Sequence, residues 1–204
     1  MTPITDLTVL QAVRLKGQLQ PANLAETLGV ATSDLDQIVA QLQAAELLTV
    51  GTPLRLSRAG RERLAELLTA ERHTVDAATL TAAYHTFRGI NREFKALVTA
   101  WQLKDGQPNT HHDAEYDHAV LDRLDAVHQQ VLPIIATTAA QLPRLGAYAR
   151  KLSAALARVH AGEIRWLARP LLDSYHTVWF ELHEELIGAV GLTREAEARA
   201  DIDP

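Results

Sequence analysis

In the N-terminal third of the chain, short apolar stripes alternate with turn residues. The stripe in DLTVLQAVRLK has helical spacing, and Gly17 is placed to end that helix. Pro21 opens a second helix at the position where a missing N–H costs nothing, and Gly29 follows as a tight turn. A third helix follows, and Thr32 or Ser33 is predicted to cap its start. Its predicted core stripe is Leu35, Ile38, Val39, Leu42 and Ala45.

After the third helix the pattern changes to two short apolar stretches around a turn. Gly51-Thr52-Pro53 separates LLTV from LRLS, which predicts two short strands joined as a hairpin. Ser57-Arg58-Ala59-Gly60-Arg61 then leads into another helix. Residues 1–72 are therefore predicted to form one helical domain with a small β-hairpin.

Longer helical stripes fill the rest of the chain. One long amphipathic helix is predicted between residues 71 and 106, because its apolar positions recur about every 3.5 residues. These positions are Leu80, Tyr84, Phe87, Ile90, Phe94, Leu97, Val98 and Trp101. Such a stripe is typical of a core or of a dimer seam, and we expect a homodimer. KDGQPNTHHD has the composition of a loop.

Three further helices are predicted after this loop. The first starts at Asp113, and Pro133 should kink or restart it. The second runs from Pro143 to Gly162, and the third from about Glu163 to Gly188 with an interruption at Pro170. No stretch here has a strand pattern. The fold class is therefore mainly α, with an antiparallel helical bundle at residues 73–204.

The amino-acid composition of the chain excludes several kinds of functional site. The chain of 204 residues has a net charge of −5 and no cysteine, so disulfides, cysteine-based zinc sites and thiol nucleophiles are excluded. The chain has no run of about 18 apolar residues and no basic segment before an apolar core at its start. We expect a cytoplasmic protein that does not enter membranes.

Two segments of the first domain carry a resemblance to a known family. Leu24-Ala25-x-x-Leu28-Gly29-Val30 is similar to the second helix and turn of a helix-turn-helix. Glu46-Leu47-Leu48, the hairpin and Leu56-Ser57-x-x-Gly60-Arg61 resemble the wing and following helix of MarR-type winged-helix regulators. The resemblance implies a DNA-binding transcriptional regulator with its third helix in the major groove. Some winged helices serve instead as protein-docking modules.

The third helix departs from the family pattern in its charge. Its predicted outer face contains no Lys or Arg: Ser33, Asp36, Gln37, Ala40, Gln41 and Ala44. In the regulator hypothesis, glutamines of this face read adenine edges while a serine and the arginines of the wing region hold phosphates. The candidate DNA-binding residues are Ser33, Gln37, Gln41, Arg55, Arg58 and Arg61. The charge-poor helix favours the alternative, a regulatory protein whose winged helix binds a partner protein.

The second domain carries another resemblance. Several of its motifs look like a helical segment of bacterial proteins associated with pyruvate phosphate dikinase-like enzymes. The motifs are Pro108-Asn109 with His111 and Asp113, Tyr116-Asp117, Leu142-Pro143-Arg144 and DSYHTVWFELHEEL. The resemblance implies a link to phosphoenolpyruvate and pyruvate metabolism or its regulation. The chain contains no Gly-rich nucleotide loop, and we expect it to be no enzyme.

Histidines are the candidate metal ligands. His111-His112-Asp113 and His118 have residue types that bind metals, but adjacent side chains rarely point at one site. The alternative is a solvated helix start that Asp113 caps. We predict no metal site and no cofactor.

The stretch DSYHTVWFELHEEL combines histidines with carboxylates. A helical projection places the carboxylates on a polar arc, opposite His176, Trp179 and His183. Two interpretations remain for these three residues. They are core residues bonded to neighbours such as Tyr84 or Tyr148, or they line a pocket for a small anionic effector. The candidate ligand-binding residues are His176, Trp179, His183, Arg88 and Arg92.

Overall fold

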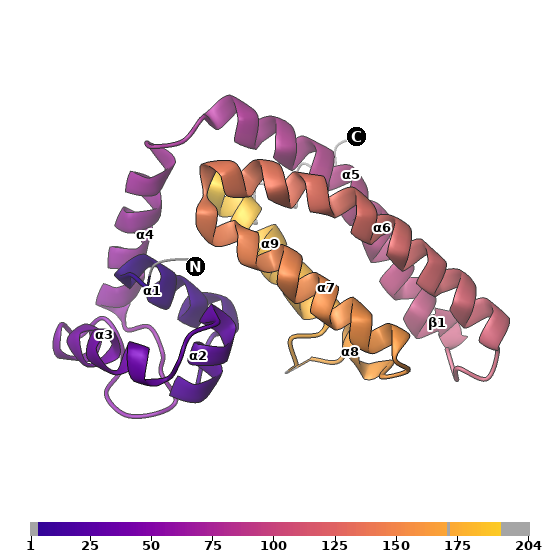
Figure 1. Cartoon of the computed structure of the whole chain (residues 1–204), viewed down its shortest axis with the longest axis horizontal. Coiled ribbons are helices and arrows are strands. Elements are labelled where there is room, and N and C mark those ends of the chain that lie inside the picture. Colours follow the sequence, from indigo (N-terminus) through magenta and orange to yellow (C-terminus); the bar gives the residue numbers. More distant parts are fainter. Residues whose placement is uncertain (1–3, 171, 193–204) are drawn as a thin grey trace. The chain divides into compact units, whose positions relative to one another are not determined.

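The computed structural model describes residues 4–170 and 172–192 and is mainly helical (Figure 1). Helices hold 73% of these residues. The chain divides into two compact units: the first extends to Val75 and includes Gly191 and Leu192, and the second runs from Asp76 to Val190. We describe each unit by itself.

The first unit contains four helices within its described residues. They are α1 (Asp6–Lys16), α2 (Pro21–Leu28), α3 (Ser33–Ala44) and α4 (Arg58–Arg72). The predicted turn residues take the expected places. Gly17 follows α1 with a φ of 74°, Pro21 is the first residue of α2, and Gly29 ends α2 in the left-handed conformation. Apolar side chains from all four helices form one core.

Helix α3 differs from the prediction at both ends. Thr32 precedes it without a side-chain cap, and the Asp34 carboxylate instead accepts a hydrogen bond from the Ala31 N–H at 3.2 Å. Leu35 and Leu42 are buried, but Ala45 is exposed. The predicted core stripe is wrong at Ala45 because the helix has ended there and Glu46 turns the chain with a φ of 58°.

The predicted hairpin is present as backbone pairs rather than as full strands. Leu48 pairs with Leu56 in an isolated antiparallel bridge. Leu19, from the connection between α1 and α2, forms a second bridge with Leu54, which the sequence pattern did not indicate. The Leu19 N–H donates to the Leu54 carbonyl at 3.0 Å, and the Leu54 N–H donates back at 2.7 Å. These two hydrogen bonds therefore connect the hairpin to the segment between α1 and α2.

The second unit contains the remaining elements. They are α5 (Ala77–Gln102), β1 (Leu103–Lys104), β2 (Gln107–Pro108), α6 (Ala114–Gln141), the 3-10 turn η1 (Pro143–Gly146), α7 (Ala147–His160), α8 (Arg165–Ala168) and α9 (Tyr175–Ala189). Strands β1 and β2 pair antiparallel, Leu103 with Pro108 and Lys104 with Gln107. They form the tip of a helical hairpin in which α5 and α6 lie side by side (Figure 1).

Three predictions for this unit need correction. The long helix begins at Ala77 rather than near residue 71, because Asp76 caps it through the Ala78 N–H at 3.0 Å. The stretch predicted as a loop contains β1 and β2. Pro133 lies inside a continuous α6, so of its two predicted effects the restart is wrong, and the kink stays a prediction. The predicted stripe of α5 is buried along its whole length, as the core interpretation requires.

Gly60 in the first turn of α4 supplies a stability test for the first unit. A Cβ placed on Gly60 would lie 2.0 Å from the Leu47 carbonyl oxygen, so backbone would have to move. We expect Gly60→Ala to lower the free energy of unfolding by about 1–3 kcal/mol. Thermal unfolding followed by circular dichroism measures the change.

Gly89→Ala is the matched control, because Gly89 lies within α5 and a Cβ added there would meet nothing within 4 Å. This change should stabilise its helix by roughly 1 kcal/mol. Equal melting temperatures for the Gly60→Ala variant and the unchanged protein would contradict the close approach of α4 to Leu47.

Candidate functional site

The outer face of α3 is open to solvent. Its exposed residues are the six that the projection placed there: Ser33, Asp36, Gln37, Ala40, Gln41 and Ala44. Gln43 attaches the last turn of α3 to the hairpin, since its side-chain N–H groups donate to the carbonyls of Thr49 at 2.9 Å and Gly51 at 3.2 Å. The structure thus joins the candidate recognition helix to the hairpin.

The three candidate arginines of the first unit are exposed, and each has a partner on the same unit. The Arg55 Nε donates to Gln18 Oε1 at 2.9 Å. Arg58 pairs with Glu62 at 3.0 Å, and Arg61 donates to the Leu56 carbonyl at 3.1 Å. Exposed interactions of this kind contribute about 0–1 kcal/mol, so an incoming phosphate can replace them at low cost.

The projection of α9 is wrong about its carboxylates. Glu181 and Glu185 are 2% and 4% exposed, whereas His176 is exposed. The reason is that α9 packs against α5 on one side and against α7 on another, so two arcs of the helix are covered. A projection that assumes a single apolar face cannot represent this arrangement.

The buried carboxylates of α9 meet cations from η1 and α7. The Glu185 carboxylate forms an ion pair with the Arg144 guanidinium, and the side chains of both residues are less than a tenth exposed. The Tyr148 hydroxyl donates to Glu185 at 3.4 Å. Burial raises the pKa of Tyr148 well above its ordinary value, and the nearby Glu185 raises it further. Lys151 lies 4.0 Å from Glu181, so this cluster joins α9 to α7.

Trp179 lies in the core of the second unit. Its ring stacks on Phe94 and Phe87, with centroids 4.3 and 5.2 Å away, and its Nε1–H donates to Asn91 Oδ1 at 3.0 Å. The side chain is 2% exposed. These contacts match the core interpretation of this residue.

The other candidate ligand-binding residues have different surroundings. The exposed His176 has its ring 6.0 Å from that of Phe94, and the half-buried His183 has its ring 5.4 Å from that of Phe87. On α5, Arg92 is exposed and Arg88 is half-buried. His176, Trp179 and His183 therefore lie along one side of α9 against α5. Their role in effector binding remains a prediction.

Helical spacing predicts a local pair of Asp125 and His128 on the exposed side of their helix, but His128 is buried. Its Nδ1 lies 3.1 Å from the Tyr175 hydroxyl and its Nε2 lies 3.2 Å from the Ser153 hydroxyl. These contacts join α6, α9 and α7. Burial lowers the pKa of His128, and the nearby Asp125 opposes that shift. The sequence pattern does not indicate these contacts, because Tyr175 and Ser153 are far from His128 in the sequence.

The turn between β2 and α6 is held by a compact polar network. The Asn109 amide donates to Asp117 Oδ1 at 2.8 Å and to the Trp101 carbonyl at 3.2 Å. His111 Nδ1 lies 2.9 Å from Asp117 Oδ2, and the His111 ring packs on Trp101 with centroids 4.4 Å apart. Within residues 4–170 and 172–192, no three His, Asp or Glu side chains are placed to share a metal ion.

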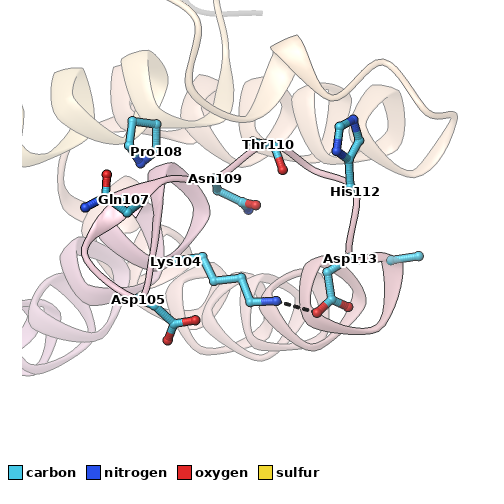
Figure 2. Close-up of a pocket in the computed structure, with 9 residues that line it drawn as sticks. Lys104, Asp105, Gln107, Pro108, Asn109, Thr110, His112 and Asp113 are labelled. Atoms are coloured by element: carbon cyan, nitrogen blue, oxygen red, sulfur yellow. Dashed lines mark hydrogen bonds and ion pairs between the residues drawn. The ribbon is translucent and has the colours of Figure 1, made fainter.

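A cavity of about 650 Å³, widely open to solvent, lies beside this turn (Figure 2). It is lined by Lys104, Asp105, Gln107, Pro108, Asn109, Thr110, His112, Asp113 and Ala114. Lys104 and Asp113 form an ion pair along one side of the cavity. Asp113 also caps α6, as predicted, by accepting from the Tyr116 N–H at 3.0 Å. The sequence pattern indicated the cap but not the cavity.

Comparisons of the chain with models of known families, with curated proteins and with solved structures gave no match. Across the described helices, none is both long enough and apolar enough to cross a membrane.

The buried His128 predicts a pH dependence of stability. In the unfolded chain this imidazole has its ordinary pKa of 6.5, and in the folded protein the pKa is lower. Between the two values the unfolded state binds more protons, so the free energy of unfolding falls as the pH falls below about 6.5. Chemical unfolding at about pH 7.5 and about pH 5.5 should show this loss, and His128→Gln should reduce it.

His118→Gln is the control for this experiment, because His118 is an exposed residue of the same helix. The control should keep the pH dependence of the unchanged protein. The account of His128 fails if its removal leaves that dependence unaltered. The exposed His176 is partly desolvated where its ring lies beside Phe94, which lowers its pKa, so it accounts for a residual dependence of the same sign.

Proposed function

We propose that the first unit is a winged helix that binds duplex DNA and that the protein is a transcriptional regulator. The support is the order of its elements: three helices, the backbone-paired hairpin and α4. The bridge between Leu19 and Leu54 adds a third paired segment to the hairpin. In this proposal α3 is the recognition helix and the hairpin is the wing.

The exposed face of α3 is the observation that carries the proposal. Gln37 and Gln41 are one helical turn apart, so their exposed side chains lie on the same side of α3. A side-chain amide pairs with adenine in the major groove through one donor and one acceptor. Ser33, one turn before Gln37, is placed to donate its hydroxyl to a phosphate.

The arginines supply the electrostatic part of the proposal. Arg55, Arg58 and Arg61 exchange their exposed partners for phosphate oxygens, which bind a guanidinium more strongly. The first 75 residues hold seven basic and eight acidic side chains, so no general positive charge assists binding. Three phosphate contacts predict a slope of about −3 for the logarithm of affinity against the logarithm of salt concentration.

The acidic start of α3 favours a second candidate function. Asp34 and Asp36 are exposed in the first turn of the helix, where they repel a phosphate backbone. Val50 at the hairpin is 89% exposed, an apolar contact suited to a protein surface. In this alternative the winged helix docks a partner protein, with a link to phosphoenolpyruvate and pyruvate metabolism. Homodimer formation is a further proposal common to both functions.

Binding of the full chain to a library of genomic DNA fragments at low salt tests the first proposal. We expect bound fragments to be enriched in a common sequence, and a gel shift with that sequence to give the salt slope stated above. Gln37→Ala or Gln41→Ala should weaken binding about 5–150-fold, the equivalent of about 1–3 kcal/mol for one base contact.

Gln130→Ala is the control, because Gln130 is an exposed glutamine of α6 in the other unit. The control should bind like the unchanged protein. Absence of binding at low salt, where phosphate contacts are strongest, overturns the regulator proposal. Sequence-specific binding contradicts a function limited to protein docking.

A further inference from the structure

The tip of the α5–α6 hairpin consists of a two-residue turn and a hydrogen-bonded loop. Asp105 and Gly106, with φ angles of 51° and 76°, form the turn between β1 and β2, and His111 adopts a φ of 57° in the loop that follows. Asn109 holds this loop by accepting a hydrogen bond from the His111 N–H at 3.0 Å. This loop forms one wall of the cavity, which Asn109, Thr110 and His112 line.

The cavity at this tip presents opposite charges next to each other. Figure 2 shows the Lys104 ammonium directed at the Asp113 carboxylate, with Asn109 and Thr110 across the opening and the His112 ring pointing away from the ion pair. The side chains of Lys104 and Asp113 are 34% and 45% exposed, so both are accessible to a ligand. The volume of the cavity lies within the range of about 300–1,000 Å³ that accommodates small ligands.

Both members of the ion pair remain charged near neutral pH. The hydrogen bond with Asp113 raises the pKa of Lys104 above its ordinary value. The hydrogen bond from Lys104 and the backbone N–H of Tyr116 lower the pKa of Asp113. A ligand with a single charge would satisfy one of these groups and leave the other without its partner. A ligand with both charges replaces one ion pair by two.

We propose that this cavity binds a free amino acid, whose carboxylate pairs with Lys104 and whose ammonium group pairs with Asp113. The amino-acid side chain extends toward Thr110. The site differs from the effector residues predicted on α9, and it stands whether or not the first unit binds DNA. Asn109 is a positioning residue here, because its amide is committed to Trp101 and Asp117.

Isothermal titration of the full chain with each of the twenty standard amino acids tests the proposal. At least one should bind with a Kd at or below about 1 mM, which corresponds to roughly −4 kcal/mol. For the tightest binder, the matched probes are its decarboxylated amine and its deaminated carboxylic acid. Each lacks one charge, and each should bind at least tenfold more weakly.

Two variants test whether the amino acid binds in this cavity. Lys104→Met removes the charge and keeps an unbranched side chain one atom shorter, and Asp113→Asn keeps a residue that caps α6. Each variant should bind the amino acid at least tenfold more weakly, while circular dichroism shows an unchanged helix content. The controls Lys95→Met and Asp122→Asn remove one charge each from exposed positions on α5 and α6 and should bind normally.

Three results would overturn the assignment. The first is that none of the twenty amino acids binds. The second is that an analogue with one charge binds as tightly as the amino acid. The third is that the Lys104→Met and Asp113→Asn variants, still folded, bind as the unchanged protein does. None of these results bears on the gel shift with α3 variants, so failure here is distinct from failure of the DNA-binding proposal.

Discussion

The second unit depends on the packing of α9 between two different surfaces. Toward α5 the helix presents Trp179, which stacks on Phe87 and Phe94 and donates a hydrogen bond to Asn91. Toward η1 and α7 it presents Glu181 and Glu185, which meet cations. The contact with α5 is mainly apolar and the contact with η1 and α7 is ionic. Each of these two surfaces therefore matches only one side of α9. This difference fixes the rotation of α9 about its own axis.

The same packing explains why DSYHTVWFELHEEL has the composition of a catalytic segment. Removing a carboxylate from water is costly unless a cation and further hydrogen bonds accompany it. Arg144 and Tyr148 supply these to Glu185. Glu181 and Glu185 thus have a structural role, whereas the rings of His176 and His183 lie beside Phe94 and Phe87 of α5. Acids and histidines that are close in sequence do not share a site here.

The sequence predicts the elements that local rules determine. Gly17, Pro21 and Gly29 act at their own positions, and the α5 stripe is periodic enough to identify its buried face. Prediction fails where the partner lies far away in the chain. Arg144 is 41 residues from Glu185, and no pattern in α9 alone indicates that its carboxylate has a buried cation to meet. The cavity beside Asp113 is lined by residues of a turn and a loop, whose arrangement sequence periodicity does not report.

The central claim is that α9 is held by the buried pair of Glu185 and Arg144 as well as by its apolar side. The direct measurement is the free energy of unfolding of Glu185→Ala compared with Glu163→Ala, which removes a 40% exposed carboxylate of the same unit. The account predicts a loss of about 3–5 kcal/mol for Glu185→Ala, because Arg144 keeps a buried charge, and less than about 1 kcal/mol for the control. Equal stabilities of the two variants would contradict it.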